Sequence, residues 1–452
     1  MARRLPKSKK DQRFSLEEAP RSLIPMGMAT LLPNASQRVR HLEQTLFEGF
    51  SKWGYREIIP PTFEYFDILS SGLPAEILEK CYKFADWTTG RVLVLRPDVT
   101  AQIARIVAMG MAGREVPLRL AYRTTVFRYE PEHAGREREI FQLGVELIGA
   151  DDASTDAEVL ILLVESLKSL GLSAFKLSIG HVRFYQALLA RSGMSEKGRK
   201  QAELAAAHKD LLKLERILRW EGVTTKQANA ILEAPGRYGR EEVLQWGRSV
   251  AGRDQALAKP IARLTQVYQL LEAAGAKDYL LLDLGEFRGF DYYDGLVFDV
   301  FSEKVGCELG GGGRYNHLVG KFGQDCPSTG FGLDVDRLFS ALDAQGVSAP
   351  PLPGRVLIVN SVRAYGEAFK VSQSLRSQGF SVLQETWPTV SRKLLPQVRM
   401  RVRQLSINHA MIVGLPELSK KGQALVVDVK ARQGTQSGLP VSFQDLPFVL
   451  GR

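Results

Sequence analysis

The stretch FRGFDYYDGLVFDVF, residues 287–301, places side chains that could bind a polar ligand at the start of an expected strand. Its first half carries Arg288, Asp291, Tyr292 and Tyr293, and its second half alternates in the manner of a strand. An arginine can hold a carboxylate through two parallel hydrogen bonds, and a tyrosine hydroxyl can donate or accept. We therefore expect a site for a small polar ligand at the mouth of this strand.

A second group of charged side chains lies in the segment VFRYEPEHAGREREIFQ, which joins two expected strands. Arg128, Glu130, Arg136 and Arg138 stand there, and a guanidinium group is well suited to phosphate and carboxylate oxygens. Several arginines in one hairpin loop could clamp a nucleotide triphosphate. The glutamates that alternate with them fit a salt-bridged surface loop equally well, so the residues alone leave both interpretations open.

Three shorter stretches also carry polar or flexible residues. In LRPDVT, Asp98 and Thr100 could receive an ammonium group, or they could cap the helix that follows. The glycines of LGGGGRY, residues 309–315, allow the backbone to approach a ligand, or they form a flexible turn. This run matches neither the dinucleotide-binding nor the P-loop fingerprint. The third stretch, STGFGLDVDRL, contains Arg337 on or just before a helix.

The pattern of apolar residues predicts the elements that position these groups. A helix is expected over residues 35–52, followed by a strand in YREIIPP that ends at Pro60 and Pro61. An antiparallel hairpin with a long loop is expected around residues 118–149. Strands that alternate with helices near the C-terminus predict a small domain with a mostly parallel sheet. The expected organisation is a disordered basic tail (1–22), a core (23–182 and 278–347), a helical insertion (183–277), a linker (348–354) and an α/β domain (355–452).

Composition limits the class of protein. The 452 residues carry a net charge of +10, with 14 basic and 5 acidic residues in 355–452, a bias that favours a nucleic-acid or acidic protein partner. No apolar run is long enough to span a bilayer, so no membrane partner is expected. Three scattered cysteines fit a reducing cytoplasm, and the histidine spacing indicates no metal site.

The order of these stretches resembles the class II aminoacyl-tRNA synthetases of the histidyl type. GYREIIPPTFE resembles motif 1, FRYEPEHAGREREIFQLGVELIG motif 2 and STGFGLDVDR motif 3, while RGFDYY and GGGGRY resemble two stretches peculiar to histidyl enzymes. Residues 355–452 resemble the family's anticodon-binding domain more loosely. The resemblance implies an α+β fold, with an antiparallel sheet core, a helical insertion and a small C-terminal α/β domain of the anticodon-binding type.

The same resemblance implies a ligand and a role for each residue. Arg288 would face the carboxylate of a bound histidine, Tyr293 and Glu146 its ring, and the remaining residues its ammonium group and the pocket wall. The implied histidine-binding residues are Asp98, Thr100, Gln142, Glu146, Arg288, Tyr292, Tyr293 and Tyr315. The implied ATP-facing set, belonging to a former or working ATP site, is Arg128, Glu130, Arg136, Arg138 and Arg337.

Two groups within the family share this pocket: histidyl-tRNA synthetases and their paralogue, the regulatory subunit of the short-form ATP phosphoribosyltransferase. Asp98 and Asp334 resemble the paralogue, since synthetases usually carry glutamate and glycine there. An aspartate at 334 should oppose a polyphosphate by its charge and bulk. We therefore predict a histidine-binding regulatory subunit with no catalysis of its own, no cofactor and no metal. It would form a homodimer core and bind the catalytic subunit that opens histidine biosynthesis.

The alternative is an active histidyl-tRNA synthetase, which would use ATP, Mg²⁺ and tRNA. The retained arginines favour it, as does a C-terminal domain that regulatory subunits usually lack. Pro396 is expected to interrupt a helix of that domain, which suggests a decayed anticodon-binding domain instead. An RNA-binding module would explain the basic C-terminal domain but leaves the histidine pocket without a purpose.

Overall fold

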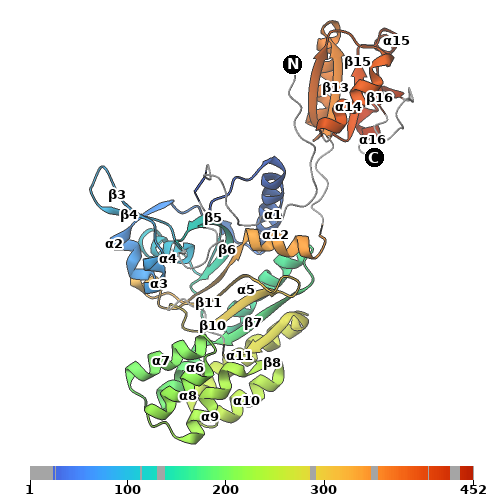
Figure 1. Ribbon diagram of the computed structural model, residues 1–452. Coiled ribbons are helices and arrows are strands. Elements are labelled where there is room, and N and C mark those ends of the chain that lie inside the picture. Colours follow the sequence, from blue (N-terminus) through green and yellow to red (C-terminus); the bar gives the residue numbers. More distant parts are fainter. Residues whose placement is uncertain are drawn as a thin grey trace. The chain divides into compact units, whose positions relative to one another are not determined.

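The computed structural model describes residues 24–25, 27–111, 113, 115–129, 138–285, 292–347, 355–405, 407–427 and 438–450. The chain divides into two compact units, residues 1–348 and 349–452, and each is described by itself (Figure 1). The expected tail (1–22) and linker (348–354) lie outside the described residues.

A nine-stranded sheet forms the centre of the first unit. Its strand order is β1-β5-β6-β12-β11-β10-β7-β9-β8, and the six strands from β5 to β7 pair antiparallel. The outer pairs β1–β5 and β7–β9 are parallel. The strands are β1 (Arg56–Glu57), β5 (Leu118–Phe127), β6 (Glu139–Ile148), β7 (Phe175–His181), β8 (Tyr238–Gly239), β9 (Leu280–Asp283), β10 (Leu296–Ser302), β11 (Glu308–Arg314) and β12 (Ser328–Asp334).

The expected hairpin is present as β5 and β6, paired from Leu118–Ile148 to Phe127–Glu139. The expected strand in YREIIPP is much shorter, because β1 holds only two residues at the sheet edge. The amide of Ile58 still donates to Ala121 O at 2.8 Å, and Pro60 and Pro61, which cannot donate, follow soon after.

Three helices cover one face of the sheet: α1 (Pro33–Lys52), α5 (Ala153–Ser169) and α12 (Val335–Ala344). The helix predicted over residues 35–52 is confirmed, and it begins two residues earlier at Pro33, since the fixed φ of proline suits a first helical position. Leu46 and Phe50 of α1 are fully buried in the core, and the Phe50 ring packs against Phe331 of β12.

The opposite face of the sheet carries α4 (Val99–Gly110), whose Ile103 and Val107 pack with Leu120 and Tyr122 of β5. A three-stranded sheet lies beside α4 (Figure 1). That sheet and its two helices are β2 (Phe63–Tyr65), β3 (Lys83–Ala85), β4 (Val92–Leu95), α2 (Phe66–Leu69) and α3 (Ala75–Glu79).

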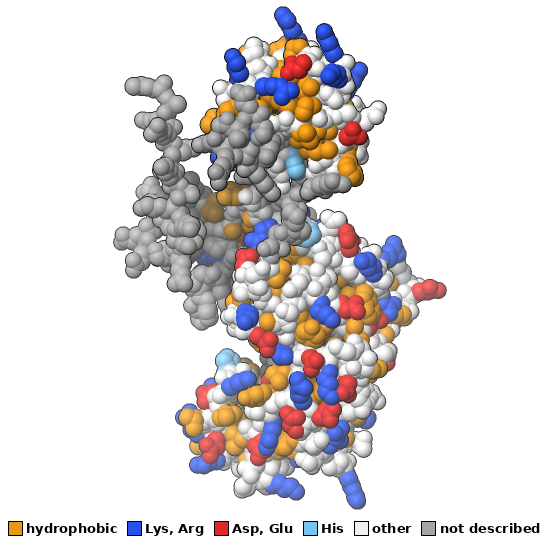
Figure 2. Space-filling model, turned by 90° about the vertical axis from the view of Figure 1, so that its right-hand side faces the viewer, with side chains coloured by type: hydrophobic (Ala, Val, Ile, Leu, Met, Phe, Trp, Pro, Cys, Tyr) orange, Lys and Arg blue, Asp and Glu red, His pale blue; other side chains and the backbone are white. Residues whose placement is uncertain are grey.

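Helices dominate the segment between β7 and β9, drawn in green and yellow in Figure 1. The last of them, α11, packs its buried residues Leu257, Ile261 and Leu264 into the same core as α5. Lys, Arg, Asp and Glu side chains are interspersed on the visible surface of this helical segment (Figure 2). The helices are α6 (Val182–Arg191), α7 (Glu196–Ala207), α8 (Leu211–Trp220), α9 (Thr225–Glu233), α10 (Glu241–Ala251) and α11 (Gln255–Ala273).

The second unit is a five-stranded sheet in the order β14-β13-β15-β16-β17. Only the pairings of β13 with β14 and β15 are parallel, so the sheet is mixed rather than mostly parallel. Its elements are β13 (Arg355–Ser361), β14 (Ser381–Trp387), β15 (His409–Val413), β16 (Gln423–Val427), β17 (Gly438–Ser442), α13 (Tyr365–Ser377), α14 (Leu395–Leu405), α15 (Pro416–Ser419) and α16 (Leu446–Leu450).

The prediction that Pro396 interrupts a helix is wrong. Helix α14 begins at Leu395, so Pro396 lies in its first turn, where the missing amide hydrogen costs no intrahelical bond. This proline is therefore compatible with a regular helix and gives no sign of decay. Basic side chains outnumber acidic ones on the visible face of this unit (Figure 2).

None of the described helices combines the length and the apolar character needed to cross a membrane.

Candidate functional site

A cavity of about 340 Å³ opens on the sheet face that carries α4. Its walls come from the starts of α4, β6 and α12 and from the strands β5, β10, β11 and β12. The described residues that line it are Asp98, Val99, Thr100, Tyr122, Arg128, Ile140, Gln142, Tyr292, Tyr293, Asp299, Glu308, Gly310, Gly311, Gly332, Asp334 and Arg337. Seven of the eight predicted histidine-binding residues are thus in this wall or, like Glu146 and Tyr315, next to it: Thr100 of the wall donates to Glu146, and Tyr315 donates to Glu146.

Asp98 both caps a helix and faces the cavity, so its two open interpretations are compatible. Its Oδ1 accepts from the amide of Ala101 at 3.1 Å, which ties down the start of α4. Its Oδ2 accepts from the hydroxyl of Tyr292 at 3.2 Å. The carboxylate is buried and lies in the cavity wall, where an ammonium group could reach it.

Glu146 is the most buried acid of the site, with 1% of its surface exposed. The hydroxyl of Thr100 donates to its Oε1 at 2.7 Å, and the hydroxyl of Tyr315 donates to its Oε2. Burial raises the pKa of Glu146 from 4.5 to about 8, an effect that the two hydroxyls oppose and the nearby Asp98 reinforces. A cationic ligand placed beside this carboxyl group would favour its ionised form and pair with it.

Two glycines make room for these side chains. A Cβ at Gly330 would collide with the Glu146 carboxylate, and one at Gly313 would lie 2.8 Å from Cδ1 of Tyr293. Gly313 belongs to the run LGGGGRY, which forms most of strand β11 in the middle of the sheet. The flexible-turn interpretation of that run is therefore wrong, and the close approach of other groups accounts for Gly313.

Three tyrosines form the aromatic part of the site. The rings of Tyr292 and Tyr293 lie 4.8 Å apart, and those of Tyr292 and Tyr315 lie 6.0 Å apart edge to face. Burial and the nearby carboxylates raise the pKa values of Tyr292 and Tyr315 well above their ordinary value, so both hydroxyls stay protonated donors. Their neighbour Arg288 lies outside the described residues, and so does its predicted contact with a carboxylate.

The predicted ATP-facing residues do not all meet at the cavity. Arg128 lines it and donates from Nε to Pro97 O at 2.8 Å. Arg138 is not among the lining residues, and its guanidinium lies 5.0 Å from the ring centre of Tyr129. Glu130 and Arg136 lie outside the described residues.

Arg337 lines the cavity but is engaged by acids. Its Nη1 donates to the backbone carbonyl of Glu308 at 3.1 Å and lies 3.7 Å from Oε2 of the Glu308 carboxylate. Its Nε lies 3.4 Å from Oδ2 of Asp334. Asp334 also caps α12 by accepting from the amides of Asp336 and Arg337, and burial raises its pKa. An incoming phosphate would have to compete with these carboxylates for Arg337.

Sequence reasoning missed Asp299, Glu308 and Tyr122 as parts of the wall. Asp299 stands among apolar residues in an alternating strand, and that single polar residue was a usable signal. Glu308 and Tyr122 carried no such signal, because only the pairing of the strands brings them to the cavity. Among the described residues, no group of His, Cys, Asp and Glu side chains is arranged to hold a metal ion.

Comparisons with known proteins agree with this architecture. The family model for histidyl-tRNA synthetase matches residues 27–338. An ATP phosphoribosyltransferase regulatory subunit of Moorella thermoacetica is 41% identical over 80% of this chain and 91% of its own length. The solved histidyl-tRNA synthetase of Nostoc sp. PCC 7120 has the same fold, with a TM-score of 0.78 over 96% of this chain and 99% of its own, at 20% identity. The predicted α+β fold of the class II synthetase type is thereby confirmed.

A second relative corrects the expectation about the C-terminal domain. The regulatory subunit of Geobacter metallireducens is 34% identical over 92% of this chain and 94% of its own length. A match of that extent must reach well into residues 355–452, so a C-terminal domain does not argue for a synthetase. The chain belongs to the family of ATP phosphoribosyltransferase regulatory subunits, paralogues of histidyl-tRNA synthetase within the class II synthetase fold.

Proposed function

We propose that this protein is the histidine-binding, non-catalytic regulatory subunit of an ATP phosphoribosyltransferase, acting at the first step of histidine biosynthesis. The observation that carries the proposal is the charge of the cavity wall. Among the residues that the structure describes, the wall carries the two guanidinium groups of Arg128 and Arg337 and four carboxylates: Asp98, Asp299, Glu308 and Asp334. Such a wall favours a ligand with an ammonium group and disfavours a polyphosphate.

Histidine fits the donors and acceptors of the cavity. Its ammonium group would lie against Asp98 and Gln142, near Thr100 at the start of α4. Its ring would lie between Tyr293 and the Glu146 carboxylate, which would lose its proton to pair with the ring. Arg288 is the residue that the family resemblance offers for the histidine carboxylate.

Regulation requires two states with different affinity for histidine. A bound histidine can shift an assembly only by the ratio of its affinities for the two states, typically worth about 1–3 kcal/mol. The partner would be an ATP phosphoribosyltransferase catalytic subunit, because the relatives are named as regulatory subunits of that enzyme. The family resemblance points to its short form. The core would pair with a second copy of itself through the motif 1 region.

The first experiment compares binding with chemistry. Isothermal titration of the purified chain with histidine should show saturable binding, and histidine-dependent ATP–pyrophosphate exchange should be absent. The Glu146→Gln variant should bind histidine about 100-fold more weakly, since a charged hydrogen bond is worth about 1.5–3 kcal/mol. Glu165→Gln, on the exposed side of α5, is the matched control and should bind normally.

Either result of the exchange assay decides the role. Robust exchange would show that the chain activates histidine, and the synthetase would replace the regulatory subunit as the proposal. Without exchange, adding the short catalytic subunit should yield a complex whose phosphoribosyltransferase activity depends on histidine concentration.

A further inference from the structure

A second cavity, of about 300 Å³, lies where the helical insertion meets the sheet core. Its walls come from the start of α5, the junction of β7 and α6, the first turns of α11 and the ends of β10 and β11. The described residues that line it are Asp151, Asp156, His181, Arg183, Lys259, Pro260, Arg263, Asp294, Gly295, Leu296, Arg314 and Asn316. None of them lines the first cavity, which opens on the sheet face that carries α4.

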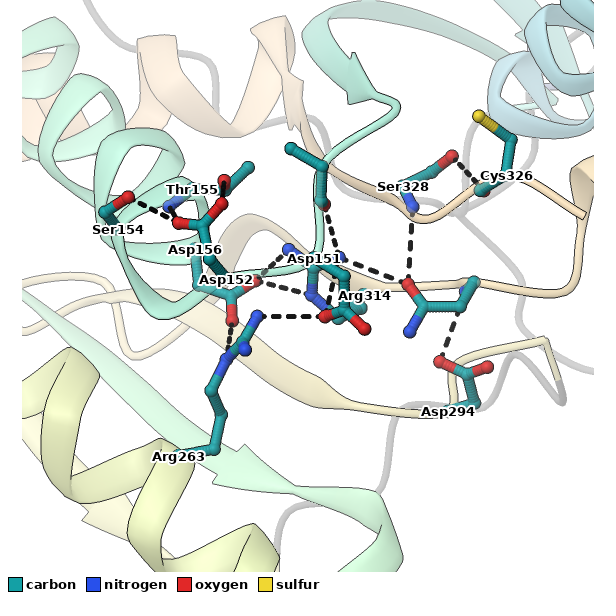
Figure 3. A network of polar contacts seen from close by, with 12 residues as sticks. Asp151, Asp152, Ser154, Thr155, Asp156, Arg263, Asp294, Arg314, Cys326 and Ser328 are labelled. Atoms are coloured by element: carbon teal, nitrogen blue, oxygen red, sulfur yellow. Dashed lines mark hydrogen bonds and ion pairs between the residues drawn. The ribbon is translucent and has the colours of Figure 1, made fainter. Parts of the chain in front are cut away.

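Buried ion pairs build the inner wall (Figure 3). The side chain of Asp156 is fully buried; its Oδ1 accepts from Nε of Arg314 at 2.8 Å and its Oδ2 from Nε of Arg263 at 2.7 Å. Arg314 also donates to Ala150 O at 2.9 Å and to Asn316 Oδ1 at 3.1 Å. Because Arg263 comes from the insertion and Arg314 from the core, these bonds fix the cavity across both parts.

The other two carboxylates of the wall are also paired. Asp151 lies 3.1 Å from Nη2 of Arg263, and Asp294 lies 3.4 Å from Nη2 of Arg183. Four cationic side chains thus line the cavity against three acidic ones. The surplus is Lys259, an exposed residue near the start of α11 that makes no ion pair with any residue the structure describes.

His181 supplies a buried polar atom without a partner. Only 9% of its surface is exposed, and its Nδ1 makes no hydrogen bond to the described part of the chain. Burial, with Arg183, Arg263 and Arg314 nearby, lowers the pKa of His181 to about 3, so the imidazole is neutral. The residue also precedes α6, whose start has no side-chain cap, and the partial positive charge of a helix start favours an anion.

We propose that this cavity is a binding site for a tetrahedral oxyanion, either inorganic phosphate or the phosphate group of a small ester. Lys259 and Arg183 would meet the oxygens from the mouth, and Nδ1 of His181 would donate to one from the inner wall. Donors that converge from separate elements suit a group with oxygens in several directions. A planar carboxylate presents only two oxygens and would leave part of this set unused.

The test uses the full chain and inorganic phosphate as the probe. Isothermal titration at constant ionic strength should show one saturable site, and Lys259→Met should weaken it about tenfold, the usual worth of one charge-assisted bond. Lys226→Met removes an exposed lysine from α9, outside the cavity, and should leave binding unchanged. Ribose 5-phosphate, with ribose as its control, distinguishes an ester site from a site for free phosphate.

Histidine NMR gives a readout of position that does not depend on affinity. Phosphate should shift the imidazole signals of His181, which the His181→Asn spectrum identifies by their loss. Binding that Lys259→Met leaves unchanged, with His181 signals unmoved, would place the anion elsewhere and overturn the proposal. Failure of both phosphate and ribose 5-phosphate to bind would overturn it as well.

Discussion

Two buried carboxylates in the same unit are balanced in opposite ways. Glu146, at the first cavity beside α4, accepts from the hydroxyls of Thr100 and Tyr315, and its pKa rises to about 8. Asp156, at the second cavity, is held by the guanidinium groups of Arg263 and Arg314. Hydroxyls donate hydrogen bonds to a carboxylate without carrying a charge. Arginines donate hydrogen bonds and also carry a positive charge that offsets the carboxylate.

The difference indicates what each cavity can bind. A carboxyl group bonded only by hydroxyls has no cation to hold it ionised, so a cationic ligand can favour the loss of its proton and pair with the resulting carboxylate. A carboxylate already bound by two arginines holds the wall together, and Lys259, the surplus cation of that cavity, remains available to an anion. The same sheet thus supports an acidic cavity on one side and a basic one beside the insertion.

The largest expected effect comes from Asp156→Asn, which leaves the buried Arg314 and the partly buried Arg263 without their shared carboxylate. Breaking a buried pair in this way costs about 3–5 kcal/mol of unfolding free energy. Urea unfolding of the variant and the wild type measures the loss. The control is Asp151→Asn, whose side chain is 50% exposed and should cost less than about 1 kcal/mol. Equal losses in both variants would show that the buried position is not special.

The Glu146→Gln substitution should raise the free energy of unfolding rather than lower it, by an amount that depends on pH. Between pH 4.5 and about 8 the folded protein holds a proton on Glu146 that the unfolded chain releases, so rising pH destabilises the wild type. Glutamine does not titrate, so the variant lacks this loss of stability and should gain about 3 kcal/mol relative to the wild type from pH 5 to pH 8. Urea titrations at the two pH values measure the change; Glu165→Gln should show none.

A smaller effect is expected from Asp334→Asn, which removes one negative charge from the first cavity. Asparagine can still cap α12, so the helix should persist while Arg337 loses an acidic partner. ATP affinity should rise about fivefold, corresponding to about 1 kcal/mol. Competition with a fluorescent nucleotide measures it, with Asp336→Asn as the control. An unchanged affinity would mean that Asp334 does not exclude nucleotide.

Much of the fold and of the first cavity followed from local sequence. The spacing of apolar residues predicted α1 and the β5–β6 hairpin, because both elements depend on residues that are close together in the chain. The family motifs brought together Asp98, Glu146 and Tyr315, which the structure places around one cavity. The shortness of β1 was missed, because its length depends on how far it pairs at the edge of the sheet. The regular α14 was missed, because the place of Pro396 depends on the residue at which that helix begins.

The second cavity could not have been predicted. Asp156 lies on a helix, Arg263 on another more than a hundred residues later, and Arg314 at the end of a strand. No spacing or motif connects them, and each alone resembles an ordinary surface charge. Only the packing of α11 against α5 and β7 makes them neighbours, which depends on the whole insertion rather than on any local pattern.

The smallest expected effect links the two cavities. Consecutive residues serve both: Asp294 and Arg314 line the second cavity, while Tyr293 and Tyr315 lie at the first. A bound oxyanion would offset the positive surplus and favour the ammonium group of histidine, so saturating phosphate should raise histidine affinity about twofold. Histidine titrations with and without phosphate measure this. The Lys259→Met variant should bind histidine with the wild-type affinity in the absence of phosphate and show no enhancement in its presence. An equal histidine affinity of the wild type with and without phosphate would show that the two cavities are not coupled.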